Sequence, residues 1–405
     1  MSCQRLSGLV RSFALYNAEI NCEPMMQTPQ CREEVLSGAS VLATLARIQK
    51  RMLMTLLSVI LCIAGTSYAQ NTLTTAPANV PANGLGAPHC VSVTLAVALE
   101  PGQAANYQIS GELCLPASGQ ADVVQVTVHG ATYDHRYWNW PLQSLVYSYA
   151  GYMTRAGYAV FDYDRIGNGF SSHPDSTDVS VTSDSYVAHE VVGALRSGQL
   201  DGYTFKRVVM VGHSLGSYIT IQEAATYRDI DALILTGIGH DVNPNALSLG
   251  VSDFYPAALD PEFSNLRLDA GYLTTLPNKR AALFYNTTTA EPAVIAYDES
   301  IKQTVTTPEL AALEASGSES PYAYARQIQV PVLLVDGQTD LFFCQGDSTC
   351  SSAASLKTAE NPFYSPAAKL QTFVVPVTGH DLNLHVTAPE WFGVALRWAV
   401  DTVGL

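Results

Sequence analysis

One serine of the chain stands in a setting that could make it a nucleophile. Ser214 is the central residue of GHSLG (residues 212–216), which follows the apolar run VVMV and precedes the helical pattern YITIQEAATY. A serine on a sharp turn between a strand and a helix needs small neighbours, and glycine flanks this one on both sides. We therefore predict that Ser214 attacks a carbonyl carbon in covalent catalysis.

A base and a carboxylate must come from other strand ends, because a serine hydroxyl is a weak nucleophile at neutral pH. His380 follows the last strand-like run, LQTFVVPV, and precedes the helical pattern APEWFGVALRWAV. Asp340 lies in a turn just beyond the run VPVLLVDG. We predict His380 as the general base and Asp340 as the carboxylate behind it. Asp336 and Asp347 remain alternatives to Asp340, and His385 remains an alternative to His380.

The same chemistry needs two backbone N–H groups that stabilise a developing oxyanion. The N–H of Leu215 is one candidate, because it lies at the start of the helix that follows the nucleophile. The second is expected from the loop after VTVHG, where Ala131 follows His129 and Gly130, with Thr132 as the neighbouring option. His213, beside the serine, is expected to point elsewhere on steric grounds.

The elements that would position these groups can be predicted from the apolar runs. Two alternating stretches, VSVTLAVAL and NYQISGELCLP, indicate a pair of half-buried antiparallel strands. Five short β-branched runs follow, most of them separated by helix-length segments, which favours a mainly parallel sheet with helices on both faces: DVVQVTVHG, AGYAVFDYD, FKRVVMVGH, IDALILTG and VPVLLVDG. About ninety residues separate the last two runs, far more than the usual connection, so we predict an insertion there.

Taken in order, these motifs resemble the α/β-hydrolase superfamily across about residues 90–405. The resemblance is carried by the HG pair at 129–130, the loop DRIGNGFS at 164–171, GHSLG, the GxxD of 337–340 and the GH pair at 379–380. It implies an α/β fold with a mostly parallel eight-stranded sheet flanked by helices. It also implies a core formed by residues 90–240 and 326–405, with a cap over the active site at residues 241–325. Ser214, Asp340 and His380 match the triad positions of that family, and Ala131 and Leu215 match its oxyanion positions.

The N-terminal region indicates export. A secretory signal peptide is predicted at residues 52–69, where two basic residues precede a run of roughly a dozen apolar residues. Residues 1–69 would then be a leader, and residues 70–89 a lead-in to the core. The run is short for a permanent membrane anchor, so we expect a secreted protein without one.

Four cysteines remain after such cleavage. An even number in a secreted chain predicts disulfides, and proximity favours Cys90 with Cys114 and Cys344 with Cys350. In the same compartment the sequence Asn286-Thr287-Thr288 is a candidate glycosylation site.

Composition narrows the partners and the chemistry. The formal charge of −15 disfavours nucleic acid as a partner, and the cysteine spacing gives no sign of a zinc site. We expect no metal and no organic cofactor. The predicted activity is hydrolysis of a carboxylic ester, lactone or thioester of a small molecule through an acyl-enzyme. Three alternatives remain: a peptidase or amidase of the same fold, a hydrolase or cyclising enzyme acting on a secondary metabolite, and a binding protein that has lost turnover.

Overall fold

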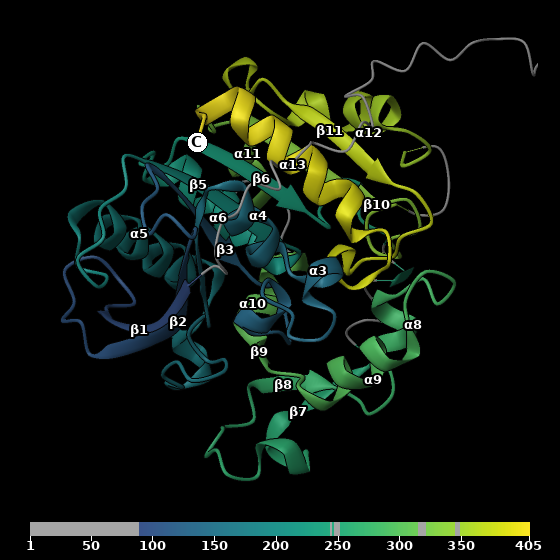
Figure 1. The fold of residues 1–405 in the computed structure, drawn as a ribbon. Helices are drawn as coiled ribbons and strands as arrows, with labels where there is room; N and C mark the ends of the chain where they lie inside the picture. The colour runs from purple at the N-terminus through teal and green to yellow at the C-terminus, as the bar shows by residue number, and fades with distance from the viewer. Residues whose placement is uncertain (1–88, 244, 247–251, 315–320, 345–348) are drawn as a thin grey trace, which may run out of the picture. The chain divides into compact units, whose positions relative to one another are not determined.

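An eight-stranded, mostly parallel sheet organises the fold (Figure 1). The computed structural model describes residues 89–243, 245–246, 252–314, 321–344 and 349–405. The strand order is β1-β2-β4-β3-β5-β6-β10-β11; β1 and β2 run antiparallel, and from β4 onward neighbouring strands are parallel. The predicted fold class is therefore confirmed. The strands are β1 (His89–Val97), β2 (Tyr107–Leu115), β3 (Val123–Val128), β4 (Ala159–Tyr163), β5 (Arg207–His213), β6 (Ala232–Thr236), β10 (Val332–Gly337) and β11 (Gln371–Val375).

Helices cover both faces of this sheet, which explains why its central strands are so apolar. Every residue of β3, β4, β6 and β10 is buried, as expected for parallel strands with helices on each side. Helices α4 and α13 pack together on one face, and α5, α6 and α11 pack together on the other (Figure 1). The helices are α3 (Ser144–Tyr147), α4 (Tyr149–Ala156), α5 (Val181–Ser197), α6 (Leu215–Thr226), α8 (Arg280–Phe284), α9 (Pro292–Ser300), α10 (Thr307–Glu314), α11 (Pro321–Ala325), α12 (Ala353–Glu360) and α13 (Ala388–Val403).

The interval between β6 and β10 contains its own small sheet. Strand β8 (Tyr272–Thr275) pairs antiparallel with β7 (Phe254–Pro256) and with β9 (Val305–Thr306). Helices α8 and α9 lie beside this sheet, and α10 follows β9 directly. Residues from β7, α8 and α10 line one pocket together with residues that follow β5 and β11. The interval between β6 and β10 therefore forms part of the pocket wall at the edge of the sheet where the parallel strands end.

Two disulfides fix local segments of the chain. Cys90 on β1 and Cys114 on β2 are register partners in the antiparallel pair and are joined to each other. Cys344 is joined to Cys350 in the segment that follows β10. These are the two pairings that proximity along the sequence favours.

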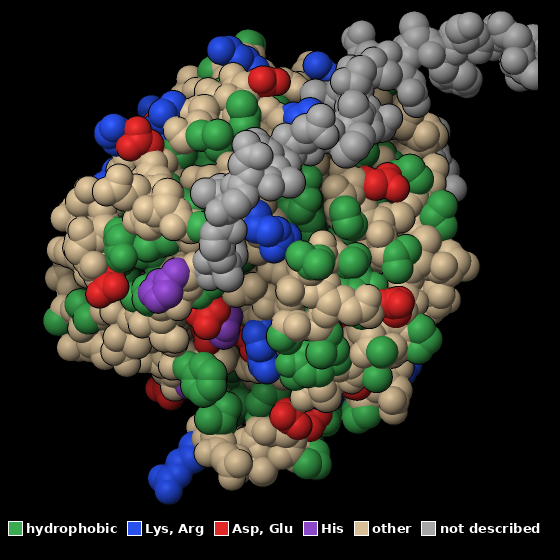
Figure 2. Space-filling model, viewed as in Figure 1, with side chains coloured by type: hydrophobic (Ala, Val, Ile, Leu, Met, Phe, Trp, Pro, Cys, Tyr) green, Lys and Arg blue, Asp and Glu red, His purple; other side chains and the backbone are tan. Residues whose placement is uncertain are grey.

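Some of the predictions fall on residues that the structure does not describe. The predicted signal peptide (52–69), nearly all of the lead-in (70–89) and Asp347 lie outside the described residues. Within the described ranges, no helix is both long and apolar enough to span a bilayer. On the face drawn in Figure 2, the described acidic and basic side chains are interspersed rather than gathered by sign.

Candidate active site

Ser214 lies on a sharp turn between β5 and α6. Its φ of 53° and ψ of −119° lie in a region that side-chain-bearing residues rarely occupy. A Cβ on Gly216 would overlap the carbonyl oxygen of Val128, and a Cβ on Gly212 would lie 2.6 Å from the Cα of Ser217. Both glycines are therefore required by close packing of the turn against β3 and α6. The turn leaves the serine side chain facing a pocket.

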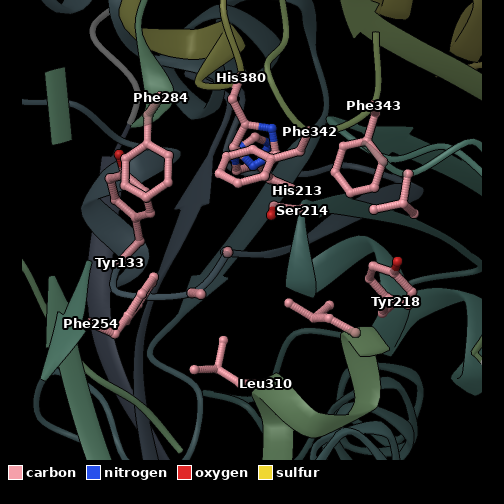
Figure 3. A pocket seen from close by; sticks show the side chains of 14 residues that line it. Tyr133, His213, Ser214, Tyr218, Phe254, Phe284, Leu310, Phe342, Phe343 and His380 are labelled. Carbon is pink, nitrogen blue, oxygen red and sulfur yellow. The ribbon is translucent and has the colours of Figure 1, made fainter. Parts of the chain in front are cut away.

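His380 and Asp340 form a buried pair beside this turn. Nδ1 of His380 lies 2.7 Å from Oδ2 of Asp340, and only 3% and 1% of the two residues are exposed. The other oxygen of Asp340 accepts the N–H groups of Phe342 (2.8 Å) and Phe343 (3.3 Å). Because Nδ1 is engaged by Asp340, Nε2 is the ring nitrogen left available, and His380 and Ser214 line the same pocket (Figure 3).

The protonation of His380 depends on two opposing effects. Burial lowers the pKa of its imidazole, but the charge and hydrogen bond of Asp340 outweigh burial and raise the pKa above its usual value. A carboxylate that raises the basicity of an imidazole also stabilises the imidazolium that forms when the ring accepts a proton. The pair is therefore suited to general-base chemistry.

The alternative acid and base occupy other positions. Asp336, at the end of β10, accepts the N–H of Ile238 through Oδ1, and its Oδ2 has no hydrogen-bond partner among the described residues. Burial raises the pKa of Asp336 well above its usual value. Both ring nitrogens of His385 are engaged by backbone: Nε2 accepts from Asn286 and Gly379, and Nδ1 donates to the carbonyl of Asp381. Asp336 and His385 are thus bound to other groups and are not part of the hydrogen-bonded pair of His380 and Asp340.

The backbone N–H groups of Ala131 and Leu215, near Ser214, have no hydrogen-bond acceptor among the described residues. Gly130 holds the loop of Ala131 against the turn, because a Cβ there would lie 3.2 Å from the Cβ of Ser214. Thr132, the neighbouring option, donates its N–H to the carbonyl of Thr304 at 3.1 Å. The N–H of Thr132 is therefore engaged, whereas those of Ala131 and Leu215 remain available as donors.

An apolar pocket opens over Ser214. Its lining combines residues of the core loops with residues of the interval between β6 and β10, and most of its side chains are aromatic or aliphatic (Figure 3). The cavity volume, counted as the space open to atom centres, is about 60 Å³. The apolar lining residues include Tyr133, Tyr218, Val242, Phe254, Phe284, Leu310, Leu313, Phe342 and Phe343.

A buried arginine holds the loop that carries Ala131. Arg165 donates from Nε to the carbonyl of His129 (3.2 Å) and forms ion pairs with Asp184 on α5 and Glu309 on α10. All three charged side chains are fully or almost fully buried. Arg165 lies within the DRIGNGFS motif, but nothing in that motif indicates this role. Its partners come from distant segments, and no local pattern marks them.

Groups of possible metal ligands do occur among the described residues. Atoms of His213, His380 and Asp381 lie within 4.8 Å of one another. Each already has a protein partner, however: His380 contacts Asp340, and His213 contacts Thr236 and Asp381. Their geometry is accounted for without a metal, so we assign them no such role.

Asn286, the candidate glycosylation site, is half-buried near the turn of Asp340. Its Nδ2 donates to Oγ1 of Thr339 at 3.0 Å, and its Oδ1 accepts from the N–H and hydroxyl of Thr288. A glycan on Nδ2 would replace the contact with Thr339.

Comparisons with known proteins agree with this architecture. The model of a family described as "Alpha/beta hydrolase family" matches residues 125–393. An enol-lactonase from Burkholderia xenovorans has a similar solved structure, with a TM-score of 0.50 and 16% identity over 74% of this chain and 97% of that chain. A soluble variant of monoglyceride lipase from Saccharomyces cerevisiae gives a TM-score of 0.50 and 13% identity over 73% of this chain and 92% of that chain. At these identities the likeness concerns the fold. No curated protein matches the chain.

Proposed function

The chain belongs to the alpha/beta hydrolase family, and on this premise we propose that it is a secreted serine hydrolase that cleaves a small carboxylic ester, lactone or thioester. The observation that carries the proposal is the grouping of Ser214, on its strained turn, with the hydrogen-bonded pair of His380 and Asp340 at one apolar pocket. The two free N–H groups of Ala131 and Leu215 supply what such a reaction also needs.

The proposed reaction has two halves. In the first, Oγ of Ser214 attacks the carbonyl carbon while Nε2 of His380 takes the hydroxyl proton, and Asp340 stabilises the resulting imidazolium. The carbonyl oxygen becomes an oxyanion that accepts hydrogen bonds from Ala131 and Leu215. Collapse of this intermediate breaks the bond to the leaving alcohol, which receives the proton from His380. In the second half, water attacks the acyl-enzyme by the same route and releases the acid and the free serine.

The lining and the size of the pocket favour a small and apolar substrate group. Among the described residues, its walls contribute no charged side chain besides the imidazoles, so a charged acyl group would lose its hydration without a partner from them. The cavity of about 60 Å³ favours a short chain over a long one. We therefore expect short acyl esters to be better substrates than long-chain esters.

Labelling with a fluorophosphonate tests the nucleophile. The purified protein should be labelled at Ser214, and Ser214→Ala should lose labelling and about 10⁶-fold in kcat, the usual cost of removing such a nucleophile. Folded wild-type protein that is neither labelled nor active would refute the proposal and favour a binding protein.

A substrate panel tests the reaction class. p-Nitrophenyl esters of increasing chain length should be hydrolysed faster than aminoacyl anilides, and acetate or butyrate esters faster than decanoate esters. Faster turnover of the anilides would instead indicate the peptidase or amidase alternative.

A further inference from the structure

A buried polar cluster lies behind the pocket and joins the core loops to the interval between β6 and β10. We call it the Asp381 cluster, and its members are Tyr133, His213, Arg280, Asp298 and Asp381. All five side chains are buried, with at most 4% of any of these residues exposed. They come from the loop after β3, the end of β5, α8, α9 and the segment after His380, respectively.

The part of the cluster contributed by α8 and α9 is an ion pair. Arg280 donates from Nε and Nη2 to the two oxygens of Asp298, at 2.7 and 2.8 Å. Its Nη1 donates to Oγ1 of Thr132 at 2.7 Å, and its guanidinium carbon lies 4.3 Å from the centre of the Tyr133 ring. Asp298 is thereby neutralised, while Arg280 contacts the two residues that follow Ala131.

The part contributed by the core loops contains a hydrogen bond whose proton can be assigned. The hydroxyl of Thr236 donates to the carbonyl of Gly212, so it can only accept from Nδ1 of His213, 3.1 Å away. Burial lowers the pKa of His213 well below its usual value, so the ring is neutral and Nε2 carries no proton. Yet Nε2 lies 3.3 Å from Oδ1 of Asp381. A hydrogen bond between these two acceptor atoms requires a proton on Asp381.

The contacts of the Tyr133 hydroxyl independently indicate that Asp381 carries a proton. Its hydroxyl, which has one proton, lies against Oδ2 of Asp381 and also 3.2 Å from Oδ2 of Asp298. One hydroxyl proton serves one of the two contacts, so a second proton is needed for both. Asp298 already has Arg280 as its counter-ion. The second proton therefore belongs to Asp381.

We propose that Asp381 is a positioning residue that acts as a protonated carboxyl, joining the His213 ring behind the nucleophile to Tyr133 and, through Tyr133, to the Arg280–Asp298 ion pair. This inference rests on the proposed function, because its effect is on the alignment of Ser214, Ala131 and His380. Asp381 adjoins His380 in the chain, His213 adjoins Ser214, and Tyr133 is two residues from Ala131. One neutral carboxyl thus links the three loops that carry the proposed chemistry.

The backbone around Asp381 is also held by the interval between β6 and β10. The N–H of Asp381 donates to the carbonyl of Phe284 at 3.1 Å. A Cβ on Gly379 would lie 2.7 Å from that same carbonyl oxygen and 2.7 Å from the N–H nitrogen of Asn286. The carboxyl of Asp381 therefore has little freedom to turn away if it loses its proton.

Ionisation of Asp381 would remove the link. Burial and the charge of Asp298 raise the pKa of Asp381 to about 7, while the charges of His380 and Arg280 and the hydroxyl of Tyr133 act in the opposite direction. The other titratable groups nearby are Tyr137, which stacks on His213, Tyr285, which donates to Asp298, and His385, which donates to the carbonyl of Asp381. The protonated form predominates below pH 7 and is lost as the pH rises through that value. Above it, a carboxylate faces the lone pair of His213 and the contact is repulsive.

Two substitutions at one position separate this role from simple packing. Asp381→Asn keeps a donor for His213 and an acceptor for Tyr133 at every pH, whereas Asp381→Leu keeps the volume and removes both. With p-nitrophenyl acetate at pH 6.5, Asp381→Asn should stay within about threefold of wild type, consistent with the modest net effect of exchanging one neutral hydrogen-bonding group for another. Asp381→Leu should lose on the order of 10²-fold in kcat with little change in KM, the usual effect of a misplaced reacting group.

The pH profile provides the second readout. Wild-type kcat should fall as the pH rises above about 7, and kcat of Asp381→Asn should not. Tyr133→Phe, which removes only the hydroxyl, should lower kcat in the same way as Asp381→Leu and keeps the test valid should the leucine variant fail to fold.

Fluorophosphonate labelling of the same proteins separates the two hypotheses. A wild-type protein that is not labelled at Ser214 refutes the proposed function. A labelled wild type with Asp381→Asn as impaired as Asp381→Leu, or with identical pH profiles for wild type and Asp381→Asn, refutes the role of Asp381.

Discussion

Replacing Asp340 by asparagine should move the ring proton of His380 from Nδ1 to Nε2. Oδ1 of Asp340 accepts two backbone N–H groups, from Phe342 and Phe343, so the amide oxygen of an asparagine would occupy that site. Its NH₂ group would then face Nδ1 of His380, where Oδ2 now lies at 2.7 Å. An amide that donates to Nδ1 forces the ring proton onto Nε2, the nitrogen that must accept the proton of Ser214.

The size of the expected loss in kcat follows from this change of tautomer. A base whose only available nitrogen is already protonated loses about 10⁴-fold in kcat, as when the acid of such a triad becomes an amide, which corresponds to about 5 kcal/mol in the activation free energy. Packing should change little, because the side chain keeps its shape and both backbone hydrogen bonds. The assay is kcat on p-nitrophenyl acetate, with the melting temperature measured in parallel.

Asp336→Asn is the matched control. Asp336 lies four residues earlier, at the end of β10, where burial raises the pKa of its carboxyl well above the usual range. An amide there preserves the contact with Ile238 and should leave kcat near the wild-type value. A tenth of the activity retained by Asp340→Asn, or equal losses of activity in both variants, would refute this role of Asp340.

Three further predictions concern the pH profile, the pocket and the disulfides. Because Asp340 raises the pKa of His380, the neutral and active ring is present only above that raised value. In Asp381→Asn, which lacks the fall expected above pH 7, kcat/KM should therefore increase with pH through an ionisation that lies above about 6.5, the value of a free imidazole; a midpoint below it would contradict the pairing. Phe254→Ala should enlarge the pocket and shift the preference among p-nitrophenyl esters toward longer chains, and an unchanged preference would remove Phe254 from the acyl site. Cys90→Ser combined with Cys114→Ser opens a loop with a sequence separation of 24 and should lower the free energy of unfolding by about 3 kcal/mol; urea denaturation of this variant against wild type measures it, and equal midpoints would refute it.

The parallel sheet and the nucleophile turn could be predicted because both are local in sequence. β5 ends at His213 and α6 begins at Leu215, so Ser214 alone separates the strand from the helix. Gly212 and Gly216 are required by close contacts within a few residues and with the neighbouring strand. The choice between Asp340 and Asp336 could not be made in this way. Asp336 lies at the end of β10 and Asp340 in the turn after it, and which carboxylate faces His380 depends on that turn, which is closed by the hydrogen bond from the N–H of Asp340 to the carbonyl of Gly337.

The buried ion pair of Arg280 and Asp298 could not be predicted from the sequence, for a different reason. Arg280 and Asp298 lie 18 residues apart in an interval without strand-helix rhythm, and their partner Thr132 is 148 residues away from Arg280. No periodicity or spacing connects such positions. Asp381 directly follows His380 in the chain, but only tertiary structure provides its partners.

Both buried arginines act on the same short loop, from opposite ends. Arg165 donates to the carbonyl of His129 and is paired with Glu309 of α10 as well as with Asp184 of α5. Arg280 donates to Thr132 and is paired with Asp298 of α9. Buried ion pairs add little net stability compared with apolar packing, but losing one partner leaves an uncompensated charge. The loop that carries Ala131 is therefore held in one position by carboxylates of the interval between β6 and β10. It follows that changes in this interval affect kcat through the loop as well as substrate preference through the pocket, and that neither effect requires contact with the reacting atoms.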